Sequence, residues 1–197
     1  MFTHSNKKIT NQTGSVAIEL TFVVGALAMC MMFAGDLAAK MTIQGELDNL
    51  SYSMANIVRD RTALYSHADN VREELSRQDA EQIDRIVRSN LTRQRAGFNN
   101  DKYAVIVEGV TFDSASNENT PATVKQLKSF HLGNKQLNCN PPSSSEFKAL
   151  TPYTNKKRYM PMYRVTICYE SPNLFYTFSG AEEGALVIQS SSINVGR

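Results

Sequence analysis

The chain has 197 residues, and its 21 Lys and Arg against 19 Asp and Glu give a formal net charge of +2. Because the two signs nearly balance and interleave, the sequence lacks the electrostatic footprint of a nucleic-acid-binding protein, and we expect no nucleic-acid partner. About 160 residues remain beyond an apolar N-terminal segment, which is enough for one modest folded domain.

The most informative stretch runs from Gly14 to Gly35 and carries Glu19 as its only charged residue. A bilayer core about 30 Å thick needs about 20 apolar helical residues, so the run predicts a transmembrane helix over 15–35. A carboxylate inside such a helix is costly and marks a functional position. Two lysines precede the run and one follows closely, which favours a cytoplasmic N-terminus and a periplasmic C-terminal domain.

Several kinds of N-terminal signal compete for this run. A secretory signal needs an A-x-A-like site just beyond it, and residues 33–40 contain none. A lipoprotein signal needs a small residue before its cysteine, but Met29 precedes Cys30, which is more consistent with a small apolar side chain in the helix. An uncleaved anchor explains the length of the run but gives Glu19 no role.

A short basic leader, 1–14, ends at Gly14, an apolar helix follows at once, and Glu19 lies five residues after the glycine. This arrangement resembles the class III signal of type IV pilins and pseudopilins. The resemblance implies that a prepilin peptidase cleaves between Gly14 and Ser15. The new α-amino group of Ser15 would be cationic and could pair with Glu19 of a neighbouring subunit. The alternative is that Glu19 reaches water along its own stem.

Region 36–100 is expected to be helical and amphipathic. The first helix is expected to continue from Ser15 to about Tyr65, with an apolar stripe at Ile43, Leu47, Leu50, Met54 and Ile57. Residues 76–79 form a candidate capping box. The helix that follows has its apolar positions at Ala80, Ile83, Ile86, Val87 and Leu91. Arginines across 59–95 alternate with acids, which predicts a solvated, salt-bridged face.

Region 101–197 is expected to be rich in β-strands. The predicted strands cover 103–112, 127–132, 163–169, 174–178 and 186–195. Strict alternation over 163–169 predicts a strand that is buried on one face only. The fold class expected is therefore α+β, with an antiparallel sheet of four or five strands packed on the long helix.

The cysteines outside the apolar run are Cys139 and Cys168. In an oxidising compartment they can form a disulfide, worth on the order of 3 kcal/mol, and the alternative is two free thiols. The three histidines are scattered and neither HExxH nor CxxC occurs. We therefore expect no enzymatic activity, no metal and no cofactor.

Two internal stretches, 50–65 and 158–168, and the serines 190–192 resemble the TadF branch of the TadE/TadF pseudopilins. The resemblance implies a minor pilin of a tight adherence (Flp) pilus that assists pilus priming, adherence and biofilm formation. Its implied partners are a prepilin peptidase, a TadE-like pseudopilin, the major Flp pilin and the inner-membrane assembly platform. Major Flp pilins are short and carry Tyr after the Glu, whereas Leu20 follows Glu19 here in a long chain, which argues against a major subunit.

Two other classes of protein are compatible with the sequence. One is a single-pass membrane sensor or ligand-binding module with an uncleaved anchor. The other is a membrane-tethered enzyme with an unfamiliar site. The first residue of the mature chain distinguishes these from a pseudopilin.

Overall fold

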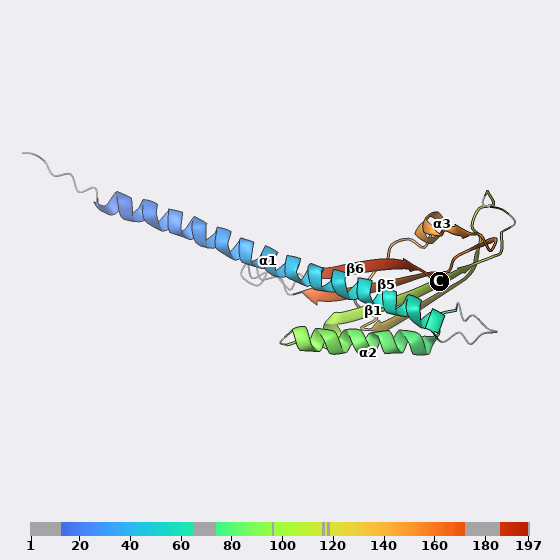
Figure 1. Cartoon of the computed structure of the whole chain (residues 1–197). Helices are drawn as coiled ribbons and strands as arrows, with labels where there is room; N and C mark the ends of the chain where they lie inside the picture. Colours follow the sequence, from blue (N-terminus) through green and yellow to red (C-terminus); the bar gives the residue numbers. More distant parts are fainter. Residues whose placement is uncertain are drawn as a thin grey trace, which may run out of the picture.

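The computed structural model describes residues 13–64, 74–95, 97–115, 117, 119–171 and 186–196. Most of the expected leader and the predicted strand 174–178 lie outside these residues. A long helix projects from one end of a domain made of a sheet and a second helix (Figure 1). The principal elements are α1 (Thr13–Leu64), α2 (Arg77–Gln94), β1 (Tyr103–Phe112), β2 (Val124–Gly133), β5 (Met162–Ser171) and β6 (Leu186–Val195). The short elements are η1 (Asn100–Lys102), α3 (Glu146–Leu150), β3 (Tyr153–Thr154) and β4 (Arg158–Tyr159).

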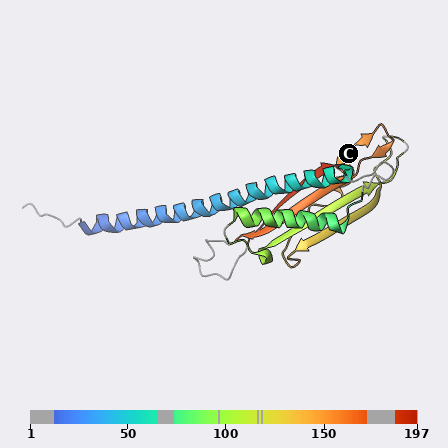
Figure 2. The same cartoon turned by 60° about the horizontal axis from the view of Figure 1, so that its bottom comes forward.

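The main sheet has the strand order β2-β1-β5-β6, and every neighbouring pair is antiparallel. Helices α1 and α2 lie side by side on one face of this sheet, α1 over β5 and β6, and α2 towards β2 (Figure 2). The predicted α+β class is confirmed. The predicted strand 127–132 is longer than expected, because β2 begins at Val124 and ends at Gly133.

The main core lies between the helices and this face of the sheet. The α1 stripe predicted from its spacing is buried at Ile43, Leu47, Leu50 and Met54. These side chains meet alternate residues of the central strands, namely Tyr103, Val105, Val107, Tyr163, Val165 and Ile167. The helical period of the stripe and the two-residue period of the strands place both apolar sets on the same interface.

Helix α2 begins at the predicted capping box. The Ser76 side chain accepts a hydrogen bond from the backbone N–H of Asp79 at 3.2 Å, and the Asp79 carboxylate accepts one from the Ser76 N–H at 3.1 Å. The predicted inward position of Ile86 is wrong, because this side chain is 42% exposed whereas Asp84 is 8% exposed. The predicted salt-bridged face is present on α2, where Arg77 pairs with Glu81 at 2.9 Å and Arg88 pairs with the buried Asp84 at 2.7 Å.

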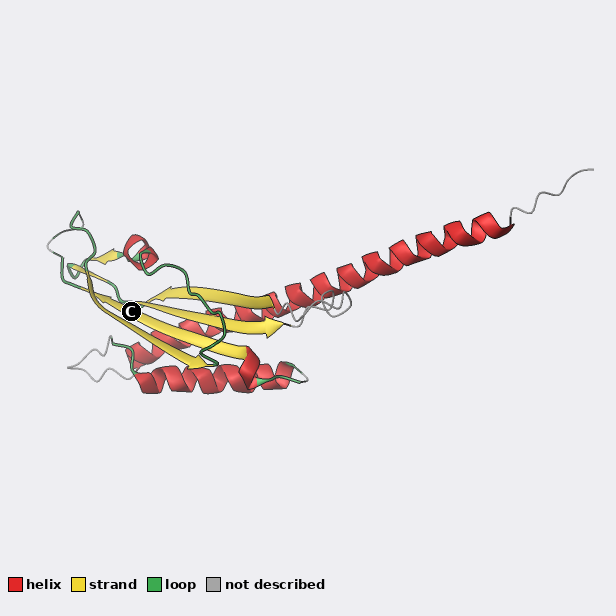
Figure 3. Ribbon diagram, turned by 180° about the vertical axis from the view of Figure 1, so that it is seen from behind, coloured by secondary structure: helices red, strands yellow, loops and turns green. Residues whose placement is uncertain are grey.

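The prediction that β5 is buried on one face only is wrong. Arg164, Thr166 and Cys168, which point away from the helices, are as fully buried as the core side. The segment 134–152, which leaves β2 and contains α3, passes over this second face of the sheet (Figure 3). We call it the covering segment. It places Leu137, Cys139 and Phe147 against the sheet, a coverage that the alternation within a single strand cannot reveal.

The covering segment starts with a tight turn at Gly133, whose φ is +79°. A Cβ at this position would lie 2.6 Å from the carbonyl oxygen of Tyr103, so only glycine fits. The same carbonyl accepts a hydrogen bond from the Asn134 N–H at 2.8 Å. This turn redirects the chain from the edge strand across the sheet.

A buried ion pair connects the sheet to the covering segment. Arg164 on β5 lies opposite Glu108 on β1, and its Nε and Nη2 both lie 2.6 Å from Glu108 Oε2. The guanidinium also lies 4.6 Å from the centre of the Phe147 ring and contacts the Ser143 carbonyl at 3.5 Å. One fully buried arginine therefore joins both central strands and the start of α3.

Replacing Arg164 tests how much the Arg164–Glu108 ion pair contributes to the free energy of unfolding. Arg164→Ala leaves the Glu108 carboxylate buried and unpaired, which should lower the free energy of unfolding by about 3–5 kcal/mol. The double variant Arg164→Met/Glu108→Leu should recover most of this loss. As a control, Arg77→Ala removes an exposed pair with Glu81 and should change stability by less than about 1 kcal/mol. Urea unfolding of the full chain in detergent, followed by tyrosine circular dichroism, measures all three; equal losses for Arg164→Ala and Arg77→Ala would contradict the assignment.

Candidate assembly helix

The first half of α1 projects away from the described part of the domain (Figures 1 and 2). Residues 16–35 are all exposed, although most of them are apolar. The large apolar side chains on this stretch are Val16, Ile18, Leu20, Phe22, Val23, Val24, Leu27, Met29, Met31, Met32 and Phe33. Soluble proteins rarely expose so large a contiguous apolar surface. We call residues 16–35 the stem.

The stem is long and apolar enough to cross a membrane. The best window of the helix Val16–Asp60 has a mean hydropathy of 2.2, and none of that window is buried. At 1.5 Å per residue the stem spans about 30 Å, which matches the hydrocarbon thickness of a bilayer. By length and composition the predicted apolar helix is suited to serve as a single-pass membrane anchor, and it is continuous with the helix that packs on the domain.

The residues predicted to act in processing and assembly lie at the free end of the stem. Gly14 and Ser15 are in the first turn of α1, where the structure describes the backbone alone, and Glu19 follows four residues after Ser15. Positions four apart share a helix face. The Glu19 side chain is exposed, and no hydrogen bond or ion pair within the described part of the chain involves it.

The other end of the stem is marked by a buried charge. Asp36 is 7% exposed, and its carboxylate lies 2.5 Å from Lys40 Nζ one turn further along. About 25 Å of uncharged helix separates Asp36 from Glu19. The paired Asp36 therefore marks where α1 passes from exposed apolar surface to the folded domain.

Beyond Asp36, α1 docks along β6 through a row of polar side chains. Ser51 is fully buried, and its Oγ lies 2.9 Å from both Ser190 Oγ and Ser192 Oγ. Further along, Asn194 donates to the Asn56 side-chain oxygen at 2.9 Å. These contacts form what we call the serine seam. They give a packing role to the serine run 190–192.

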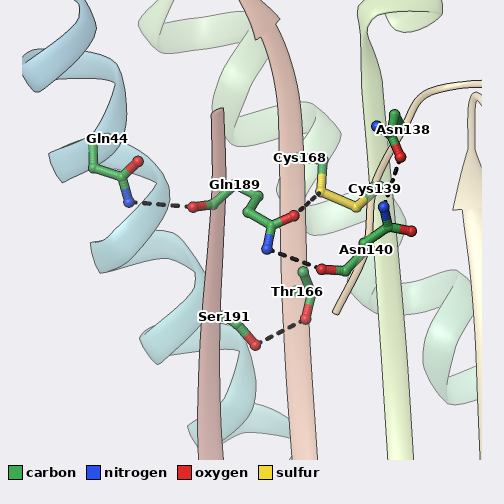
Figure 4. The surroundings of a disulfide bond; sticks show 8 residues. All are labelled: Gln44, Asn138, Cys139, Asn140, Thr166, Cys168, Gln189 and Ser191. Atoms are coloured by element: carbon green, nitrogen blue, oxygen red, sulfur yellow. Dashed lines mark hydrogen bonds between the residues drawn. A yellow bond between two sulfur atoms is a disulfide. The ribbon is translucent and has the colours of Figure 1, made fainter. Parts of the chain in front are cut away.

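The disulfide expected as one of two alternatives is present in the structure, where Cys139 and Cys168 are joined across a sequence separation of 29 residues (Figure 4). It ties the covering segment to β5. Nearby, Gln189 of β6 donates its side-chain N–H to the Asn140 carbonyl at 2.9 Å, and Gln44 of α1 donates to the Gln189 carbonyl at 3.3 Å (Figure 4). Through Gln189, α1 is thereby connected to β6, and β6 is connected to the covering segment.

A second cluster joins α1 to the end of α2. Arg95, the C-cap residue of α2, reaches Glu46 of α1 at 2.6 Å, and its guanidinium carbon lies 5.0 Å from the centre of the Tyr169 ring. Both arginine and carboxylate are largely shielded. The domain half of α1 is thus held on one side by β6 and on the other by α2.

Burial and neighbouring charges shift the pKa values of Tyr103 and His131 in the domain. Burial, reinforced by the neighbouring Asp84 carboxylate, raises the pKa of Tyr103 well above its usual value, so this phenol stays protonated at neutral pH. Partial burial and the charge of Lys135 lower the pKa of His131. Among the described residues, no group of three His, Cys, Asp or Glu side chains is placed to hold a metal ion.

These features, a bare apolar stem continuous with a docked helix and an α+β domain, can be compared with known families. A family model, TadF, described as "Putative tight adherence pilin protein F", matches residues 7–197. The chain belongs to the TadF family. Searches of curated proteins and of solved structures found no match. Membership confirms the resemblance stated from the sequence and places this chain in a structural, pilin-like family.

The sequence pointed to the stem and missed the docking contacts. Ser51 flanks the apolar stripe of α1, and Ser190 and Ser192 alternate on β6, so each has the period of a buried position. The hydrogen-bond partners of these hydroxyls could not be predicted, because the contact joins residues about 140 positions apart in the chain. The same holds for Glu46 with Arg95.

A matched pair of serine substitutions tests the serine seam. Ser51→Leu forces a bulky side chain into the fully buried contact with β6 and should lower stability by about 2–3 kcal/mol. Ser53→Leu places the same side chain at an exposed position of the same helix and should change stability by less than about 0.5 kcal/mol. Urea unfolding and limited proteolysis of the two full-length variants provide the comparison, and similar behaviour of both would contradict close docking of α1 on β6.

Proposed function

We propose that this TadF-family protein is a minor pilin of a tight adherence (Flp) pilus, cleaved after Gly14 and acting in pilus priming and assembly. The observation that carries the proposal is the stem, an exposed apolar helix with one carboxylate near its free end that continues without interruption into a folded domain. A sensor domain needs an anchor of this length but has no use for that carboxylate.

Processing would supply the partner for Glu19. Cleavage between Gly14 and Ser15 by a prepilin peptidase releases residues 1–14 and creates an α-amino group with a pKa near 8, which is cationic at neutral pH. Within one helix, Glu19 and this amine are separated by a turn. Between adjacent stems, the amine of one subunit and Glu19 of the next would neutralise each other in apolar surroundings and set the axial register of the two helices.

The size of the folded domain supports the role of a minor pilin better than that of the major pilin subunit. Each copy carries a folded domain much broader than its stem (Figures 1 and 3). A subunit of this kind suits the start or the tip of a filament, where few copies are needed. We infer an inner-membrane location with a cytoplasmic N-terminus and a periplasmic domain. The partners would be a TadE-like pseudopilin, the major Flp pilin and the assembly platform, and the outcome would be adherence and biofilm formation.

The mature N-terminus and Glu19 test the proposal together. Intact mass spectrometry of the protein from the producing cell should show a chain that starts at Ser15. Glu19→Gln, which removes the charge and keeps the shape, should leave membrane insertion and domain stability unchanged. It should reduce pilus assembly by at least about tenfold, because an unpartnered amine is then left in the stem contact.

A matched carboxylate variant provides the control. Glu81→Gln alters an exposed acid on α2 and should assemble normally. A mature chain that begins at Met1 would contradict the processing step and support an anchored sensor. Normal piliation by the Glu19→Gln variant would show that the carboxylate does not act in assembly.

A further inference from the structure

The second face of the sheet carries a groove that the proposed function does not use. It consists of two adjoining hollows that share Ser145 and Lys148. The first hollow is floored by the sheet residues Val110, Val124 and Leu127. The second continues beside α3, and its lining includes Pro121, Ala122, Ala149, Pro152, Tyr153 and Tyr159. We call the two together the α3 groove.

The α3 groove adjoins an open sheet edge. Among the described strands, β2 pairs with β1 alone, so its outer edge can accept a further strand. A strand added there would place every second side chain on the face that carries Val124 and Leu127. Leu127 is 45% exposed on that face. Such an edge with an adjacent apolar hollow is the arrangement by which proteins bind extended peptides.

Charge restricts which strand would fit. Among the described residues that line the groove, Lys148 is the only charged side chain, and it borders both hollows. Lys125 on β2 is also exposed. Lysines on an edge strand discourage pairing with arbitrary strands. The positive charges of Lys125 and Lys148 favour an added strand that carries carboxylates.

The chain itself contains a segment with this chemistry. Residues 172–185, outside the described part of the structure, include the apolar and aromatic run 174–178, which has the composition of a strand, followed by Glu182 and Glu183. The pairing of Ser171 with Leu186 fixes both ends of this segment at the stem end of the sheet.

The geometry rules out the groove of the same copy. With both ends fixed, 14 residues reach out at most about 24 Å. Val110 in the groove pairs with Met162 at the opposite end of β5, about 30 Å along the strand from Ser171, and β2 lies two strands further across. Figures 1 and 3 place α3 at the end of the domain away from the stem. Only a second copy can present the segment to the groove.

We propose that segment 172–185 of one copy binds the α3 groove and β2 edge of another, with Glu182 or Glu183 facing Lys148. The stem end of one domain would then contact the far end of the next. This is a heterologous contact, which forms a ring where the rotation between copies closes and an open stack where it does not. The inference rests on the proposed assembly function for its purpose, but it concerns different residues from those of the stem.

Photo-crosslinking of purified full-length protein in detergent tests the contact. One tagged copy carries Leu127→p-benzoylphenylalanine, and a second, differently tagged copy is unmodified at that position. Irradiation should crosslink the two copies, with the adduct mapped by mass spectrometry to residues 172–185 of the second copy. The same probe at Ile86→p-benzoylphenylalanine, an exposed position on α2, should give no adduct in that segment.

Charge reversal makes the test specific. Lys148→Glu should lower the crosslink yield about fivefold or more, and Glu182→Lys/Glu183→Lys in the second copy should restore it. Lys135→Glu, at an exposed lysine outside the groove, should have no effect. Adducts that map elsewhere, or a yield insensitive to Lys148→Glu, would overturn the proposal. Because Glu19→Gln does not touch this contact, the crosslink should persist in that variant even where piliation fails, so the two proposals can fail separately.

Discussion

The structure depends on one helix, α1, whose two halves have different surfaces: the first is apolar on every face, and the second packs on the sheet. Helix α1 is continuous over 52 residues, about 78 Å. Its stem exposes apolar side chains on every face, whereas its second half buries one stripe against the sheet and presents polar groups elsewhere. The change occurs at Asp36, a buried carboxylate paired with Lys40. An exposed apolar surface of this extent marks a site of contact with lipid or with other protein, so we expect the stem to lie in a bilayer or against other helices.

The domain is constructed to hold that helix firmly. The serine seam and the Glu46–Arg95 pair attach α1 to β6 and α2 by directional contacts, in addition to the apolar core beneath it. The linked side chains around the disulfide continue from Gln44 to the covering segment. A closed loop of this length contributes about 3.5 kcal/mol by restricting the unfolded chain. These contacts therefore attach α1 to the edge strand β6, to α2 and, through Gln189, to the covering segment.

How much of this could be predicted follows from the range of each interaction. The stem, the α1 stripe, the capping box at Ser76 and the strand 103–112 are encoded by neighbours in sequence, and each was predicted from spacing or composition. Contacts between distant segments were not. The alternation of β5 was read as one polar face because Arg164 gave no indication of Glu108, its partner 56 residues away. Coverage by residues 134–152 is likewise a property of the chain path. Glu19 was singled out because a carboxylate in an apolar run is anomalous by itself, without any partner in view.

The most direct test of the central claim uses a native residue. Cys30 lies in the domain-side half of the stem, five residues before Gly35, and is the free cysteine of the described structure, exposed in the isolated chain. If the stem is embedded in lipid or in a filament, a membrane-impermeant maleimide should fail to label Cys30 in native membranes and should label it fully after denaturation in detergent. Rapid labelling of Cys30 in intact membranes would show that the stem is in water and would contradict the account.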